Sequence, residues 1–295
     1  MDLLNVTGFH RRAPHLVAQE KGFFANEELE VRFHLATFAP DHNQGMAEGR
    51  WDMGLGSADN MISRATTHGV DFLLVFQAEE GLTAKLIGRP GITSLEQLKG
   101  KLLAGDPGDS NLDLIRRKIF RSHGIGEDQY EVEIIGSSPK RLEAFLQNRV
   151  HAAMLTPPCI DKALSAGGVL LANAEEYVPH WPLTCGWGLR SWLETHRQVV
   201  VRFIRAWVAA TDWLLEPQHR EETLQLLMKF EELTPAAAER AYGNVVPKAR
   251  INPKALAALL ELRKEMGVYR PPHHPPERFY DSSYWCEATG LPAPQ

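Results

Sequence analysis

The stretch LLNVTGFHRRAPHLVAQEKGFFANEELEVRFHLA, residues 3–36, decides the fold class. Its first apolar run, residues 3–9, is typical of a strand, and residues 29–36 alternate in polarity as a half-buried strand does. The intervening residues 14–22 predict a short helix, because a proline stands near its first turn and a glycine at its end. The stretch therefore predicts a β-α-β unit with parallel strands.

Strand and helix patterns continue to alternate outward from this unit. A helical stretch from Asp41 to Gly49 precedes the third strand, and a linking strand at 83–89 leads to a second α/β series. After a strand at 183–190, the apolar positions take helical spacing. The other strands are predicted at residues 52–57, 72–78, 101–105, 131–137 and 152–156, and the other helices of the two series at 59–69, 111–123 and 139–149.

This alternation predicts an α/β protein of two lobes, in which each lobe is a mostly parallel sheet flanked by helices. Residues 1–88 and 186–295 are expected to form a discontinuous first lobe, and residues 92–182 an inserted second lobe. A ligand cleft is expected between the lobes, because ligands settle at the carboxyl ends of the strands in open α/β sheets.

The composition argues against several classes of partner and cofactor. The formal net charge of -5 does not suggest nucleic-acid binding, and no apolar run approaches the roughly 20 residues of a membrane span. The three cysteines are widely spaced, so we expect reduced thiols and no metal or other cofactor. As the sequence stands, it begins without a signal-peptide pattern, which predicts a cytoplasmic protein, or a periplasmic one if a leader has been removed.

Four further segments matter for their sequence and their order: APHLVAQEKGFFANEELEVRF (13–33), AEGRWDMGLGS (47–57), SLEQLKGKLLAGDPGDS (94–110) and FLQNRVHAAMLTPP (145–158). In this order they resemble the periplasmic solute-binding proteins of the nitrate, sulfonate, taurine and thiamine-precursor group. The C-terminal PERFYDSSYWCEA also resembles the usual ending of that group.

The resemblance implies a periplasmic-binding-protein-like fold that closes around a small molecule by hinge motion. It implies a solute-binding component of an ABC-type uptake system, with a permease as partner, or a cytoplasmic relative of such a component. From the arginines at 11 and 12 and from Trp187, we expect an organic anion, aromatic or heteroaromatic in character.

The alternative is a cytoplasmic enzyme on the same fold. It would be a decarboxylase or another lyase or hydrolase that acts on a small aromatic acid or a pyrimidine-like compound. The candidate acids and bases are His10, His42, Glu79 and Asp109. Some relatives of this group are enzymes that use cysteine or lysine motifs. Those motifs do not occur in this sequence, so the chemistry of these relatives does not carry over.

Ligand contacts are expected where the predicted strands end, including the loop at 38–42. An arginine at 11 or 12 suits an anion or forms a solvated basic corner, and the residues that open the 59–69 helix hold an anion or only cap the helix. The predicted ligand-binding residues are His10, Arg11, Arg12, Ser57, Ala58, Asp59, Asn60, Gln77, Asp106, Asp109, Ser110, Asn111, Thr156 and Trp187.

Several of these positions have a structural interpretation beside the functional one. GDPGDSN, residues 105–111, lacks the lysine of a phosphate loop and the ligand spacing of an EF-hand, so it is either a ligand-facing wall or a capped turn. Trp187 either stacks on a flat ligand or packs between the lobes. Glu79 either meets a ligand amine or lies at a solvated edge, and Cys159 is either a reactive thiol or a small buried residue.

Overall fold

The computed structural model describes residues 1–36 and 39–294, with only the backbone for residues 39–41. The chain divides into two compact units. Unit 1 comprises Met1–Glu80, Pro182–Glu261 and Tyr269–Gln295, and unit 2 comprises Gly81–Trp181 and Leu262–Val268.

The sheet of unit 1 has the strand order β2-β1-β3-β10-β4. β1 pairs in parallel with β2, from Asp2 opposite Leu29 to Gly8 opposite Leu35, and in parallel with β3. β10 runs antiparallel to both of its neighbours, so the sheet is mixed. The bounds are β1 Asp2–Gly8, β2 Leu29–Leu35, β3 Met53–Gly56, β4 Phe72–Glu80 and β10 Pro182–Leu189.

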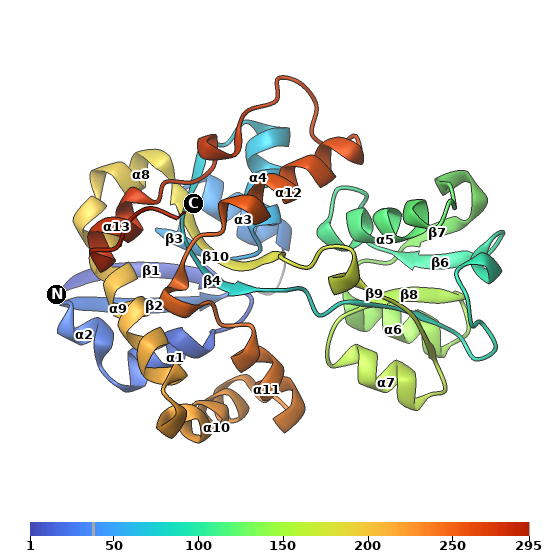
Figure 1. Ribbon diagram of the computed structural model, residues 1–295, viewed down its shortest axis with the longest axis horizontal. Helices are drawn as coiled ribbons and strands as arrows, with labels where there is room; N and C mark the ends of the chain where they lie inside the picture. Colours follow the sequence, from blue (N-terminus) through green and yellow to red (C-terminus); the bar gives the residue numbers. More distant parts are fainter. Residues whose placement is uncertain (37–38, 295) are drawn as a thin grey trace. The chain divides into compact units, whose positions relative to one another are not determined.

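Helices cover both faces of this sheet, with α1, α2 and α9 on one side and α3 and α4 on the other (Figure 1). The helices of the first 80 residues are α1 Ala13–Glu20, α2 Phe23–Asn26, α3 Ala39–Ala47 and α4 Ala58–His68. The later helices are α8 Arg190–Thr195, α9 Arg197–Leu215, α10 Arg220–Glu231, α11 Pro235–Gly243, α12 Pro253–Glu265 and α13 Ser283–Thr289.

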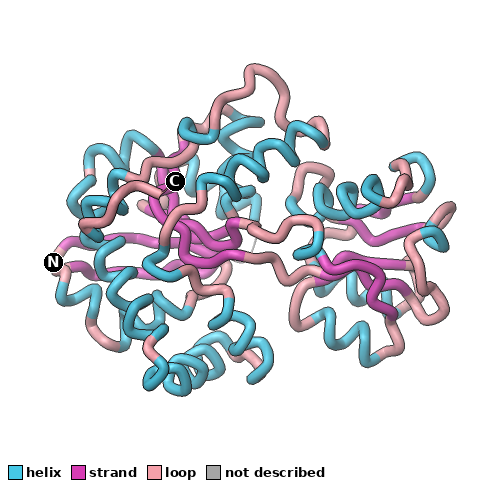
Figure 2. The backbone as a smooth tube through the Cα atoms, in the orientation of Figure 1, coloured by secondary structure: helices cyan, strands magenta, loops and turns pink. Residues whose placement is uncertain are grey.

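Unit 2 has a second mixed sheet, with the order β7-β6-β8-β5-β9. β6 is parallel to β7 and β8, whereas β5 is antiparallel to β8 and β9. Figure 2 shows that helices also flank the strands of this unit. The bounds are β5 Lys85–Gly88, β6 Leu102–Gly105, β7 Glu131–Ile134, β8 Ala152–Leu155, β9 Val169–Asn173, α5 Asn111–Ser122, α6 Ser138–Leu146 and α7 Cys159–Ser165.

The predicted α/β class is confirmed by these two sheets, and the predicted strands lie in them. One strand was missed: β9 follows Gly167 and Gly168 in the run GGVLLAN and pairs with β5. The segment at 83–89, predicted as a linking strand, is an interior strand of the second sheet. Short 3-10 turns occur at Glu96–Leu98, Glu127–Gln129, Ala174–Glu176, Pro217–His219, Pro247–Ala249 and Pro276–Arg278.

The core of unit 1 is built around α9, whose apolar positions face α1 and the sheet. Phe24 stacks on Phe203 of α9 with ring centroids 5.5 Å apart, which explains the aromatic residues after the Gly22 turn. His15 of α1 is fully buried beside Phe33 and Trp207, at ring distances of 5.0 and 6.1 Å. Neither ring nitrogen of His15 meets a hydrogen-bond partner among the described residues.

We predict that His15 makes the protein sensitive to acid. Burial lowers the pKa of His15 to about 4, the charge of Arg11 adds to this shift, and Glu231 opposes it. In the unfolded chain a histidine has a pKa of about 6.5, so between these two values the unfolded state binds a proton that the folded state does not. The free energy of unfolding should therefore fall as the pH drops from about 6.5 to about 4, by up to about 3 kcal/mol from this residue.

Urea unfolding at a series of pH values measures this dependence. His15→Leu, which keeps the site apolar, should flatten the profile between pH 6.5 and 4, whereas the exposed His68→Leu should leave it as in the wild type. An unchanged profile in the His15 variant would show that the acid sensitivity arises elsewhere.

Gly54 of β3 lies directly opposite Trp187 of β10, in the antiparallel pair of these strands. A Cβ atom at this position would come within 2.8 Å of the Trp187 ring. We predict that Gly54→Ala destabilises the protein by about 1–3 kcal/mol, because overpacking a closed core forces neighbours to shift. Gly108→Ala is the control, since a Cβ there meets nothing within 4 Å, and circular dichroism in urea measures both changes. Equal stability of the two variants would contradict this packing constraint.

Candidate functional site

The carboxyl ends of β1 and β4 and the amino end of the antiparallel strand β10 meet at one buried carboxylate. The side chain of Glu79, at the end of β4, is only 2% exposed. Its Oε2 lies 3.2 Å from Nη1 of Arg12, and it accepts a hydrogen bond from the hydroxyl of Thr184 at 2.6 Å. This ion pair fixes the Arg12 side chain at the edge where ligands of α/β sheets bind.

Arg11 and His10 share a different carboxylate, that of Glu231 at the end of α10. Arg11 donates through its backbone N and Nε to Oε1, both at 3.2 Å, and through Nη2 to the Phe230 carbonyl at 3.1 Å. His10 Nδ1 lies 3.4 Å from Oε2, and its side chain is 62% exposed. Burial raises the pKa of Glu231, but the hydrogen bond to His10 and the contacts with Arg11 outweigh this and hold the pKa below its usual value.

The residues after β3 form a helix cap. Ser57 Oγ accepts a hydrogen bond from the backbone N of Asp59 at 3.3 Å, and the Asn60 N donates to the Ser57 carbonyl at 3.0 Å. Ala58 and Asp59 are buried. The structure thus shows the capping interpretation of Ser57, and a ligand contact by these four residues stays a prediction.

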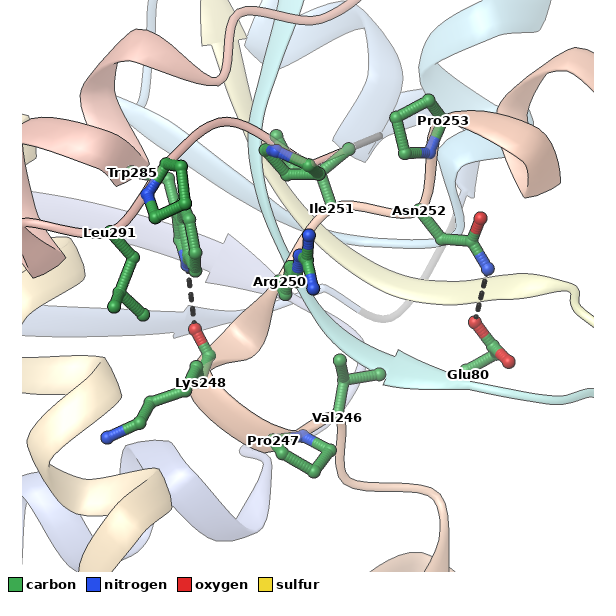
Figure 3. Close-up of a pocket in the computed structure, with 12 residues that line it drawn as sticks. Glu80, Val246, Pro247, Lys248, Arg250, Ile251, Asn252, Pro253, Trp285 and Leu291 are labelled. Atoms are coloured by element: carbon green, nitrogen blue, oxygen red, sulfur yellow. Dashed lines mark hydrogen bonds between the residues drawn. The ribbon is translucent and has the colours of Figure 1, made fainter.

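Gln77 supports the end of β4 from inside the protein. It is fully buried, donates to Glu80 Oε2 at 3.3 Å and accepts from the backbone N of Asn252 at 3.1 Å. Asn252 also donates to Glu80 Oε2 at 3.0 Å, and its Oδ1 caps α12 through the Ala255 N. The Asn252–Glu80 bond is drawn in Figure 3.

A groove with a volume of about 670 Å³ opens beside this network in unit 1 (Figure 3). Its wall is held by Trp285, whose Nε1 donates to the Lys248 carbonyl at 2.8 Å. The sequence pointed to the neighbouring Glu79 but not to this lining, because the lining comes from segments far apart in the chain. The lining residues are Glu80, Val246, Pro247, Lys248, Arg250, Ile251, Asn252, Pro253, Trp285, Leu291, Pro292 and Pro294.

In unit 2, the loop between β6 and α5 is a tightly anchored turn. Ser110 Oγ accepts from the Asp113 N at 3.3 Å and so caps α5, while Asn111 Oδ1 accepts from the Leu112 N at 2.8 Å. Two arginines hold the backbone of the loop: Arg117 donates to the Gly108 carbonyl, and Arg263 Nη1 donates to the Asp109 carbonyl at 3.3 Å. The Asp109 residue itself is exposed.

Arg141 was not predicted from the sequence, yet it joins three strand ends in unit 2. It is 1% exposed, donates through Nε to the Met154 carbonyl at 2.8 Å and through Nη1 to the Gly136 carbonyl, and lies 3.4 Å from Asp106 Oδ1. The available signal was its place in the first turn of a helix that directly follows a strand. Burial raises the pKa of Asp106, and Arg141 and Ser110 oppose this only in part.

Thr156 and Trp187 occupy different surroundings. The backbone N of Thr156 donates to Ser138 Oγ at 3.0 Å, which fixes the end of β8. Trp187 is fully buried, with Phe72 and His42 edge-on at ring distances of 4.9 and 5.8 Å. A ligand would reach this indole only after one of these rings moved, and the predicted stacking contact stays a prediction.

The acid and base candidates have separate surroundings. His10 pairs with Glu231, Glu79 with Arg12, and Asp109 belongs to unit 2. His42 is buried and stacks on Trp51 with centroids 6.2 Å apart. Phe38, in the predicted loop at 38–42, lies outside the described residues. The enzymatic alternative therefore stays a prediction.

Among the described residues, no group of three His, Cys, Asp or Glu side chains could hold a metal ion. Cys159 and Cys185 are buried, and burial raises the pKa of the Cys185 thiol. No helix within the described residues is long and apolar enough to cross a bilayer.

Several solved structures with the same fold are described as binding proteins or ligand-binding components. The alkanesulfonate-binding protein SsuA from Xanthomonas axonopodis pv. citri bound to MOPS has a TM-score of 0.76 at 15% identity, over 95% of this chain and 98% of that one. The ligand-binding component of an ABC-type import system from Staphylococcus aureus, with zinc bound, gives 0.79 at 12% identity, over 98% and 99%. The periplasmic nitrate-binding protein NrtA from Synechocystis PCC 6803 gives 0.73 at 12% identity, over 98% and 88%.

These likenesses confirm the predicted periplasmic-binding-protein-like fold. No curated protein sequence matches the chain. A family described as NMT1/THI5 like matches residues 10–220, which is more than half of the 295 residues and includes most of the segments that carried the resemblance. The chain therefore belongs to the NMT1/THI5-like family.

Proposed function

We propose that the protein binds a small organic anion as the solute-binding component of an ABC-type uptake system. Two relatives of the same fold are described as alkanesulfonate-binding and nitrate-binding, and a third as a component of an ABC-type import system. A permease is the partner that such a component would need. The aromatic character of the ligand, the position of the ligand between the units and the cellular compartment stay predictions.

The observation that carries this proposal is that the Arg12 guanidinium is only partly engaged by the protein itself. Its Nη1 faces Glu79, and the side chain meets no other acceptor among the described residues. A guanidinium has five N–H donors in a fixed plane, so most of them stay available to an anion. The side chain is 24% exposed, which leaves part of it accessible to a ligand.

Glu79 prepares Arg12 for this role. A buried carboxylate holds the long side chain in one orientation before the ligand arrives, which lowers the entropic cost of binding. Arg11, in contrast, uses its backbone N, Nε and Nη2 on Glu231 and Phe230. Of the two arginines, Arg12 is therefore the better candidate for contact with the anion, and the exposed His10 is its neighbour.

We predict that Arg12→Gln weakens anion binding at least tenfold, because it removes the charged donor. Calorimetric titration with ethanesulfonate, benzoate and nitrate measures the affinity, after a thermal-shift screen has identified which of them stabilise the wild-type protein. The exposed Arg32→Gln, which makes the same change in β2 of unit 1, should leave the affinity unchanged.

Loss of Arg12 leaves Glu79 buried without its cation, which destabilises a protein by about 3–5 kcal/mol. The double variant Arg12→Gln/Glu79→Gln removes this penalty and should still bind weakly. Wild-type affinity in the double variant would exclude Arg12 as the anion contact. Failure of all three anions to stabilise the wild-type protein would argue against anion binding itself.

A further inference from the structure

The groove of about 670 Å³ in unit 1 is large enough to hold an organic molecule of medium size. All of its lining residues belong to unit 1, so the groove is complete within one compact unit. None of them is among the ligand-binding residues predicted from the sequence. The groove is therefore a site of its own, which the proposed function does not use.

Most of the groove lining is apolar. Valine, isoleucine, leucine, tryptophan and proline side chains come from the segment 246–253 and from the C-terminal tail (Figure 3). Ile251 and Trp285 are almost fully buried, whereas Leu291 is 42% exposed. An apolar chain laid along this lining would remove the Leu291 side chain and its neighbours from water, which favours binding.

The polar residues of the lining are engaged by the protein, with one exception. Glu80 Oε2 accepts hydrogen bonds from Gln77 and Asn252, and Lys248 Nζ lies 2.6 Å from an oxygen of Asp212. Asn252 also caps α12 through its Oδ1. The exception is Arg250, which is exposed and forms no hydrogen bond or ion pair with the residues that the structure describes. Its guanidinium is thus the free charged donor of the groove.

The turn before Arg250 has a strained backbone. Lys248 and Ala249 have φ angles of 59° and 50°, in the left-handed region that favours glycine. The turn is held in this conformation because Trp285 donates to the Lys248 carbonyl at 2.8 Å and Lys248 pairs with Asp212. Strained residues that the surrounding structure holds in place cluster at sites where ligands bind.

We propose that this groove binds an amphiphilic organic anion, with the carboxylate on Arg250 and the apolar chain on the lining. A guanidinium matches a carboxylate, because its planar N–H groups donate in parallel to both oxygens. The apolar lining beside it selects a ligand that carries a chain as well as a charge. The inference goes beyond the proposed function, because Arg12 does not line this groove.

Octanoate is the probe for this site, and calorimetric titration of the full chain measures its affinity. Acetate has the same charged group without the chain, and octan-1-ol has the chain without the charge. Octanoate should bind at least about tenfold more tightly than either compound, because each of them lacks one of the two contacts.

Arg250→Gln should weaken octanoate binding at least about tenfold, because it removes the charged donor. Since Arg250 has no partner among the described residues, this variant should keep the thermal stability of the wild type. The matched control is Arg270→Gln, which removes an exposed arginine of the same unit outside the groove and should leave the affinity unchanged.

A chain that ends at Gly290, the residue after α13, tests the apolar wall. It lacks Leu291, Pro292 and Pro294, and its octanoate affinity should also fall. If this shortened chain does not fold, Arg250→Gln alone decides the proposal.

The results separate this inference from the proposed function. Absence of octanoate binding to the wild type, or equal octanoate affinity in the wild type and Arg250→Gln, would overturn the groove site. A loss in Arg270→Gln as large as that in Arg250→Gln would also overturn it, because the effect would then be one of net charge. Octanoate binding that Arg12→Gln weakens and Arg250→Gln does not would place octanoate at the proposed small-anion site, leaving the proposed function intact.

Discussion

The buried carboxylate of Glu79 is the constraint on which the arrangement of the strand ends in unit 1 depends. It is almost fully buried, and such a group is tolerated only when its charge is paired and its lone pairs are used. Arg12 and Thr184 supply those partners from β1's following loop and from β10, which are far apart in the sequence. The pairing therefore joins three strand ends and determines where the Arg12 guanidinium points.

Unit 2 also has a buried charged group that is paired at the strand ends, but the sign of the buried charge is opposite. There the buried group is a cation, Arg141, and its partner Asp106 is the more exposed of the two. The first unit buries the acid and leaves the base accessible, whereas the second buries the base and leaves the acid accessible. A charged pair thus lies at the strand ends of each sheet. The more exposed partner is a hydrogen-bond donor, Arg12, in unit 1 and an acceptor, Asp106, in unit 2.

The sequence predicts the regular part of this arrangement and misses the pairing. Strand and helix periods are local, so the alternation from residue 3 onward leads to the α/β class and to the loops at the strand ends. β9 was missed because its apolar run is short and lies beside two glycines. The partner of Arg11 is a glutamate 220 residues away, and no local pattern reveals a contact at that separation. For the same reason Trp187, which could stack on a ligand by its type, is found enclosed by Phe72 and His42.

The low sequence identity to proteins of the same fold reflects the same difference between the regular elements and the contacts of individual side chains. A core tolerates exchanges among apolar residues as long as volume and pattern are kept, so the sheets and helices persist at 12–15% identity. Ligand choice depends instead on which donors and acceptors remain after internal pairing. In this chain Arg11, Arg117 and Arg141 are committed to the protein, while Arg12 and Asp106 keep unused capacity. Under the proposed function, ligand choice follows from such uncommitted groups and not from the number of charged residues in the strand-end loops.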